Sequence, residues 1–376
     1  MTQVAPYYKH IVAEALRLSV SRHPASFIGM FDCGKNYVFN LVTMTKTDPK
    51  QPLFVPVSLT KTDDGDAQIL SAFSIGLTQA TKTLVNLKTY EELFFTMQAL
   101  CNNRPVTLVL HFGSNEPVKL LLLEHVYRWR NIFGKDKFNW LIFANYDILN
   151  SKDATTPLFE KTIKTNIIPV SLVDKKSFLR VYKNYTEYFG PTKITSDAFF
   201  NLTGGNTGLL KSLFLLSQRG KLNDWQSDSQ TLIRIEKVFE GLSKKELHFL
   251  HDLLVKKSVK KAGVYYKNLK TFGYLNKNDD LFSPLVREYF LNTFDESEVK
   301  LSATQQKIFQ ELKNKYPAIV SRDSVAQVMW GARWTEDYSD WAIDQMIYAI
   351  RNQLQALKSP WQLKTKRGKG YFLIRK

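Results

Sequence analysis

The feature that most constrains the fold is the change of periodicity along the last part of the chain, residues 301–376. Apolar residues recur at helical spacing in 301–312 and again in 340–354. Between them, Ser321 stands where a helix N-cap is expected, and Gly331 stands where that helix would end. Two apolar stretches at 361–365 and 371–374 flank a glycine-containing turn, which is typical of a β-hairpin. Three helices followed by a hairpin predict a small α+β unit.

The helix expected at 340–354 has two different faces. Its apolar stripe consists of Ile343, Met346 or Ile347, Ile350 and Leu354. The opposite side carries mostly polar and aromatic residues: Trp341, Gln345, Tyr348 and Arg351. A helix with this outer face is suited to lie against a partner such as the edges of DNA bases.

The hairpin expected after this helix is basic. Residues 358–376 contain seven Lys or Arg and no acid, which suits contact with phosphates through counterion release. Any hairpin tip on a basic protein can be lysine-rich, and this simpler explanation stays open. The candidate contacts are Lys364, Lys366, Arg367 and Lys369.

Nearly all of 301–376 resembles the OmpR-type winged helix, the output domain of bacterial response regulators. The resemblance rests on five motifs: Val320-Ser321-Arg322-Asp323, Val328-Met329-Trp330-Gly331, Ser339-Asp340-Trp341-Ala342-Ile343-Asp344, Arg351, and Arg367-Gly368-Lys369-Gly370-Tyr371. It implies that the recognition helix enters the major groove, with Gln345, Tyr348 and Arg351 facing DNA. Arg367 would be the contact of the wing with a minor groove or its phosphates. Trp341 departs from the family, because many relatives have Arg there, so one phosphate contact is in doubt.

Composition is consistent with a nucleic-acid partner. A formal charge of +17 and a pI near 9.5 predict attraction to polyanions, either nucleic acid or an anionic membrane surface, although a solvated basic surface also explains them. Two cysteines, Cys33 and Cys101, give no disulfide framework. With no apolar run of about 18 residues and no signal-peptide pattern, we expect a cytoplasmic protein without a membrane partner.

Near the start of the chain, a strand, a glycine loop and a helix follow one another. Residues 29–36, Gly-Met-Phe-Asp-Cys-Gly-Lys-Asn, have the spacing G-x-x-x-x-G-K of a phosphate-binding loop. Its backbone N–H groups would hold phosphates, and Lys35 would reach the outer ones. Asn36 replaces the Ser or Thr that holds Mg²⁺, and Asp32 adds a negative charge. A plain strand-to-helix turn explains the loop equally well.

Strands and helices alternate after this loop, which predicts a parallel sheet covered on both faces. We expect strands at 53–59, 105–112, 139–145 and 167–170 and helices at 67–81, 90–101 and 119–133. His111 stands where a metal-binding Asp is expected at a strand end, and the nearest acid downstream is Glu116. Asn145 ends its strand, where a polar sensor would lie.

Residues 27–218 resemble P-loop ATPases of the AAA+/STAND kind. The order of elements carries the resemblance, with Gly29 to Lys35 and Thr203-Gly204-Gly205-Asn206-Thr207-Gly208 as its motifs. It implies a helical lid and ATP or ADP as the cofactor, bound by Gly29, Gly34, Lys35, Asn36 and Asn145. Because the Mg²⁺-binding hydroxyl and the strand-end acids are missing, neither a metal nor hydrolysis is implied. A nucleotide-binding scaffold, a domain without nucleotide and an active ATPase all stay open.

The predicted architecture is an α/β parallel-sheet ATPase-like domain (1–190), a helical lid (191–236) and two winged helices (237–297 and 298–376). The middle winged helix rests on a capping box at Ser243 and Glu246, a second helix near 265–272 and a strand, turn and strand at 273–284. Lysines 256, 257, 260 and 261 would lie on phosphates or on a solvated face.

The sequence is compatible with three functions. The first is a sequence-specific double-stranded DNA-binding regulator of transcription, in which the ATPase-like domain has lost hydrolysis. The second is an ATP-dependent assembly on DNA, as in replication initiators or transposition ATPases, which Asn36 and His111 weigh against. The third is an interaction scaffold, with a homo-oligomer or a protein as partner.

Overall fold

The computed structural model describes residues 4–45, 48, 51–59, 65–113, 120–255, 261–294, 303–336, 338–356 and 359–375. The chain divides into two compact units, Met1–Leu291 and Asn292–Lys376. The finer subdivision of the first unit into sheet domain, lid and middle winged helix stays a prediction.

The first unit contains a five-stranded parallel sheet with the order β2-β3-β4-β1-β5. The strands are β1 (Ala25–Gly29), β2 (Leu53–Leu59), β3 (Val106–Phe112), β4 (Phe138–Asn145) and β5 (Ile167–Pro169). The three inner strands β1, β3 and β4 are almost continuously buried, as expected when helices cover both faces. The predicted parallel sheet is therefore confirmed.

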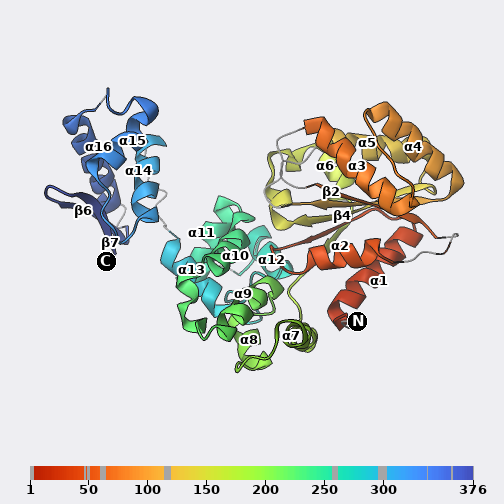
Figure 1. Cartoon of the computed structure of the whole chain (residues 1–376), viewed down its shortest axis with the longest axis horizontal. Helices are drawn as coiled ribbons and strands as arrows, with labels where there is room; N and C mark the ends of the chain where they lie inside the picture. Colours follow the sequence, from red (N-terminus) through yellow and green to blue (C-terminus); the bar gives the residue numbers. More distant parts are fainter. Residues whose placement is uncertain are drawn as a thin grey trace. The chain divides into compact units, whose positions relative to one another are not determined.

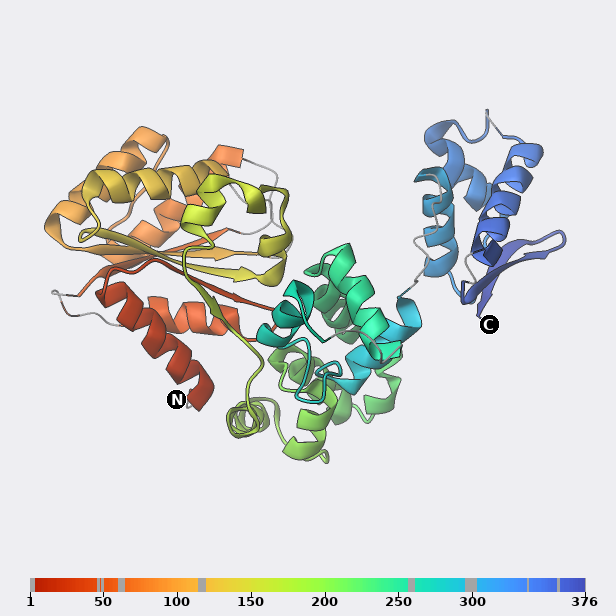
Figure 2. The same ribbon diagram turned by 180° about the vertical axis from the view of Figure 1, so that it is seen from behind.

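Helices lie on both faces of this sheet (Figures 1 and 2). One face carries α1 (Pro6–Val20) and α2 (Lys35–Thr43), and the other carries α3 (Gly65–Thr81), α4 (Tyr90–Asn103) and α5 (Leu120–Phe133), with the short α6 (Pro157–Thr162) beside α5. Stacked rings of Phe27 and Phe143, with centroids 4.8 Å apart, join β1 to β4 in the core. Because the loop between β1 and α2 starts where β1 ends, it lies at the carboxyl edge of the parallel sheet.

The rest of the first unit is helical. It comprises α7 (Lys175–Phe189), α8 (Ser196–Thr203), α9 (Thr207–Gln218), α10 (Ser229–Glu240), α11 (Lys244–Val255), α12 (Val264–Thr271) and α13 (Pro284–Thr293). The expected lid helices are α8 and α9, capped by the side chains of Thr195 and Asn206. The capping box also forms, because the backbone N–H of Ser243 donates to Glu246 Oε2 at 2.8 Å.

The hairpin predicted at 273–284 is smaller than expected. It consists of one antiparallel bridge between Leu275 and Leu281, not of two strands. Asp279 has a positive φ of 60° in the turn and accepts hydrogen bonds from Tyr266 and Lys270, so side-chain contacts hold the turn in place of a ladder. Lys261 forms an ion pair with Asp279 at 2.9 Å, while lysines 256, 257 and 260 lie outside the described residues.

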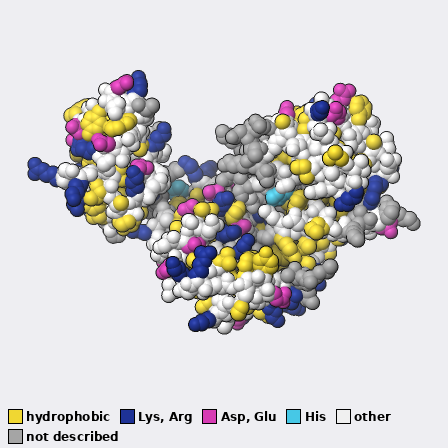
Figure 3. Space-filling view, viewed as in Figure 1, with side chains coloured by type: hydrophobic (Ala, Val, Ile, Leu, Met, Phe, Trp, Pro, Cys, Tyr) yellow, Lys and Arg dark blue, Asp and Glu magenta, His cyan; other side chains and the backbone are white. Residues whose placement is uncertain are grey.

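The second unit has the predicted order of three helices and a hairpin. Its elements are α14 (Ala303–Asn314), α15 (Arg322–Trp330), α16 (Asp340–Ala356), β6 (Trp361–Lys366) and β7 (Gly370–Arg375). A short 3-10 turn, Gly331–Arg333, follows α15. Lys and Arg side chains project at the free end of the hairpin (Figure 3).

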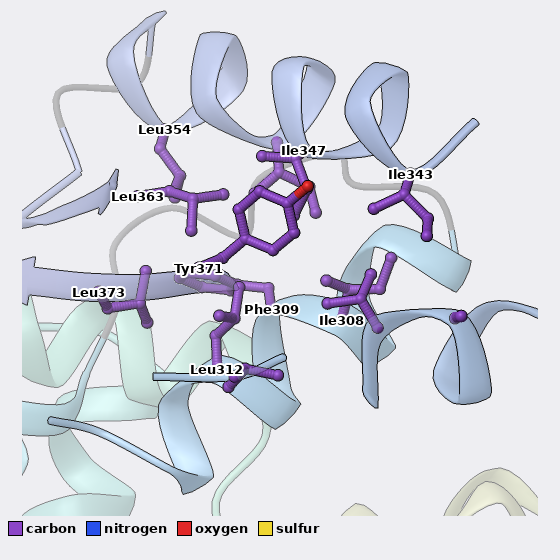
Figure 4. Close-up of a cluster of buried hydrophobic side chains, with 13 residues drawn as sticks. Ile308, Phe309, Leu312, Ile343, Ile347, Leu354, Leu363, Tyr371 and Leu373 are labelled. Atoms are coloured by element: carbon purple, nitrogen blue, oxygen red, sulfur yellow. The ribbon is translucent and has the colours of Figure 1, made fainter. Parts of the chain in front are cut away.

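A single apolar core joins these elements (Figure 4). Tyr371 of β7 lies fully buried in it, with side chains from α14 and α16 around its ring. The backbone of Tyr371 also pairs with Val320 through two hydrogen bonds of 2.8 Å, which ties the start of α15 to the hairpin. Ser321 caps α15 as predicted, because its hydroxyl accepts from Ser324 N at 3.1 Å.

Candidate functional site

The outer face of α16 is open to solvent. Trp341 and Tyr348 are 73% and 57% exposed, and Gln345 is exposed between them. Ile343, Ile347, Ile350 and Leu354 are buried on the opposite side. The two predicted faces of this helix are therefore present, and the stripe contains Ile347, while Met346 is only partly buried at its margin.

Arg351 occupies a different place from the rest of the expected contact face. Its Nε donates to the Leu363 carbonyl at 3.1 Å, and its Nη2 donates to Thr365 Oγ1 at 2.9 Å. Two of its donors thus hold β6 against α16. A direct contact of Arg351 with DNA stays a prediction, whereas its role in positioning the hairpin is visible.

The hairpin presents four exposed cations, Lys364, Lys366, Arg367 and Lys369. Because Leu363 is buried and side chains alternate along a strand, Lys364 lies on the face of β6 that points away from the core. Arg367 and Lys369 flank Gly368, which has a φ of 71° in the turn. Within the described parts of the chain, no carboxylate forms an ion pair with any of the four. Their charges are available to an anionic partner.

A cluster around Arg322 neutralises the acids at the start of α16. The Arg322 guanidinium contacts Asp340 Oδ1 at 2.8 Å and Asp344 Oδ1 at 2.9 Å. Tyr371 donates its hydroxyl hydrogen to Asp344 Oδ1 at 2.9 Å. The hydrogen bond from Arg322 lowers the pKa of Asp344, so this carboxylate is charged and paired at neutral pH. The sequence motifs contain these residues but do not predict the cluster, because its members lie on three different elements, α15, α16 and β7.

In the first unit, the loop after β1 is closed around its own lysine. Lys35 is buried, and its Nζ donates to the Met30 carbonyl at 2.5 Å. Gly34 has a φ of 99°, and a Cβ there would overlap the Tyr8 hydroxyl of α1. Gly29 serves packing, because a Cβ there would lie 2.1 Å from the Val170 carbonyl oxygen beyond β5. Only glycine suits either position.

The second motif of the ATPase resemblance packs directly on this loop. Asn206 Nδ2 donates to the Phe31 carbonyl at 3.2 Å, and Thr207 Oγ1 donates to the Asp32 carbonyl at 3.1 Å. Arg234 of α10 forms an ion pair with the Asp32 carboxylate. Arg234 was not among the predicted site residues, since nothing local connects it to a loop 202 positions earlier.

Asn36, His111 and Ser58 form a neutral hydrogen-bonded chain beside this loop. His111 Nε2 lies 2.9 Å from Asn36 Oδ1, and its Nδ1 lies 3.0 Å from Ser58 Oγ. Burial and the nearby Lys35 ammonium lower the pKa of His111 to about 4, so the ring is neutral at pH 7. Among the residues that the structure describes, no group of three His, Cys, Asp or Glu side chains could hold a metal. Glu116 lies outside the described residues.

A cavity of about 480 Å³ opens beside this loop. Four of the five residues expected to bind a nucleotide, Gly34, Lys35, Asn36 and Asn145, line it, and Gly29 does not. Their binding of a nucleotide stays a prediction. Further lining residues include His111, Tyr185, Lys211 and Arg234. Three cations against the single acid Asp32 make the cavity attractive to an anion.

The two units define two classes of domain. The first is a parallel α/β unit like the AAA+ P-loop ATPases, with the glycine loop after its β1 strand. The second is a winged helix of the OmpR type, because residues 296–373 match the family "Transcriptional regulatory protein, C terminal".

Several solved structures are similar to this chain at low sequence identity. Cdc6p from Pyrobaculum aerophilum is 12% identical, with 99% of this chain and 90% of that chain covered and a TM-score of 0.35. DnaA from Aquifex aeolicus bound to AMPPCP is 13% identical, with 95% and 90% covered and a TM-score of 0.39. Orc1 from Aeropyrum pernix in complex with DNA is 10% identical, with 100% and 90% covered and a TM-score of 0.38. Because these TM-scores are below 0.5, the similarities are no independent evidence for the fold. A search of characterised proteins by sequence gives no match.

No helix in the described parts of the chain has both the length and the apolar character needed to cross a membrane.

Proposed function

We propose that this protein binds double-stranded DNA sequence-specifically and regulates transcription. The observation that carries the proposal is the open face of α16 next to a hairpin with four exposed cations, in a segment that matches a transcription-regulator family. Arg351 joins the two parts, since it belongs to α16 and donates to β6. In winged helices of this kind, the helix reads base edges and basic side chains bind phosphates.

The cations are expected to supply affinity without sequence preference. Arg367→Ala should weaken binding to every duplex alike, and Lys366→Ala combined with Lys369→Ala should lower the salt slope of log affinity by about 2, near 1 for each phosphate contact. Lys364→Ala should weaken binding in the same way, because Lys364 and Lys366 lie on the same exposed face of β6.

Fluorescence anisotropy with labelled duplexes at several stated salt concentrations tests this. Lys88→Ala is the matched control, because it removes the same charge from an exposed position in the other unit. If the hairpin variants bind like the Lys88→Ala control at all salt concentrations, the proposed interface is wrong.

We further propose that the cavity beside the loop binds ATP or ADP without hydrolysing it. Lys211 and Arg234 line the cavity and would face the phosphates, although Arg234 also pairs with Asp32. The Lys35 ammonium lies in its own loop and donates to the Met30 carbonyl. Where the resemblance expects a hydroxyl and a carboxylate for Mg²⁺, the chain has Asn36 and His111, which are hydrogen-bonded to each other.

Calorimetric titration with ADP and with ATP, each with and without EDTA, tests nucleotide binding. We expect Lys211→Ala to weaken binding, EDTA to leave it unchanged, and phosphate release to stay at background with and without DNA. Release of phosphate that Lys35→Ala abolishes would instead support the alternative of an ATP-dependent assembly on DNA. We also propose a cytoplasmic location, which agrees with two free, buried cysteines and a DNA partner.

A further inference from the structure

The centre of the outer face of α16 carries no charge. The positions 341, 345, 348 and 352 follow one another at helical spacing and hold Trp, Gln, Tyr and Asn, all of them exposed. The charged residues of this helix lie to one side and are engaged. Asp340 and Asp344 pair with Arg322, and Arg351 donates to β6.

This chemistry suits one kind of base pair. Side-chain amides of Asn and Gln can donate to and accept from adenine N7 and N6 at once, and apolar side chains contact the methyl group of thymine. Guanine is read by Arg or Lys, which offer two donors to its O6 and N7. Neither residue type lies on the central face of α16, and the hairpin cations belong to other elements, β6 and the turn after it.

We propose that α16 selects A·T base pairs through the major groove. Gln345 and Asn352 bind adenines, and Trp341 and Tyr348 pack against thymine methyl groups. The inference rests on the proposed DNA binding and specifies the class of site. Gln345 and Asn352 are seven residues apart on the helix, or about 10.5 Å, so the two adenines lie within about three base-pair steps of each other.

The first test is selection of bound duplexes from a random pool with the full chain at a stated salt concentration. We expect enriched sites with A·T pairs at their centre. Gln345→Ala and Asn352→Ala should each lower affinity for the enriched site by about tenfold or more while leaving affinity for an unrelated duplex unchanged. Gln306→Ala, an exposed glutamine on α14, is the matched control and should change neither affinity.

The second test separates the helix from the hairpin, because a wing in the minor groove can also prefer A·T pairs. Inosine·cytosine pairs resemble A·T in the minor groove and G·C in the major groove, since inosine lacks the guanine 2-amino group. If α16 reads the site, inosine·cytosine duplexes bind as weakly as G·C duplexes, and deoxyuridine in place of thymidine weakens binding.

Four other results decide against the inference or its basis. Inosine·cytosine duplexes that bind like A·T duplexes overturn readout by α16, and so does an enriched G·C centre that Gln345→Ala leaves unaffected. Salt-dependent binding without enrichment overturns the inference but keeps DNA binding. No binding to any duplex overturns the proposed function itself.

Discussion

Protonation of His111 should destabilise the first unit in mild acid. In the neutral ring, Nε2–H donates to Asn36 Oδ1 and Nδ1 accepts from the Ser58 hydroxyl. The ring also lies near the Lys35 ammonium. A cation there would lose the acceptor nitrogen and face a like charge in a partly buried place. The pKa of His111 is about 4 in the folded protein, against an ordinary value near 6.5.

The sign follows from proton binding. Below pH 6.5 the unfolded chain binds a proton at His111 that the folded protein does not, so the free energy of unfolding falls as pH falls from 6.5 to about 4. With a pKa of 6.5 in the unfolded chain and about 4 in the folded protein, the linkage relation lowers the free energy of unfolding at pH 5 by about 2 kcal/mol. Since the ring keeps some exposure to water, we expect about 1 to 2 kcal/mol.

The measurement is a urea titration of the full chain at pH 7.5 and at pH 5.0, read by hydrogen exchange and mass spectrometry. Peptides from β3 report on the first unit, and peptides from α16 report on the second as an internal control. His111→Gln should reduce the pH-dependent loss in β3 by about 1 to 2 kcal/mol. Comparing the two pH values within each variant cancels any constant cost of the substitution. An equal loss in wild type and variant would show that His111 is not the group responsible.

Three further changes concern the second unit, and each is read by hydrogen exchange and thermal unfolding. Ser321→Ala removes the N-cap of α15 and should cost about 1 kcal/mol, whereas no cost would mean that the cap adds nothing. Gly370→Ala should largely unfold the hairpin, because its Cβ would lie 2.1 Å from the Val320 carbonyl oxygen. Gly368→Ala, at an open turn, should cost only about 1 kcal/mol. Equal effects of the two substitutions would contradict this difference. Arg351→Met keeps the side-chain stem but removes two hydrogen bonds, so amides of β6 should exchange faster, and unchanged exchange would refute its positioning role.

Local patterns predicted most of the elements. The spacing of Ile343, Ile347 and Ile350 predicts the buried side of α16 because a helix repeats every 3.6 residues regardless of its surroundings. The strand, glycine loop and helix around Lys35 follow in the same way from the local order and spacing of residues. The two-stranded hairpin predicted at 273–284 was wrong, because turn residues alone do not show how many strand hydrogen bonds form on either side of the turn. Here Asp279 in the turn is bonded instead to Tyr266 and Lys270.

The partners of the site residues could not be predicted in this way. Arg351 has the same position in the helical pattern whether its guanidinium faces DNA or a strand, and only the packed hairpin decides between them. Asn36 and His111 stand 75 positions apart, and Asp32 and Arg234 stand 202 apart. Sequence distance carries no information about such pairs.

The sequence by itself determined the order of elements, the two faces of the long helix, the basic hairpin and the presence of Asn, not Ser or Thr, at position 36 after the glycine loop. All of these depend on residue type and on the spacing of near neighbours in the chain, which are the same before and after folding. Tertiary structure alone decided that Lys35 turns into its own loop, that Arg234 meets Asp32, and that Arg322 neutralises the acids of α16. The physical reason is that a charged side chain takes the nearest opposite charge or acceptor in space, and folding decides which group is nearest.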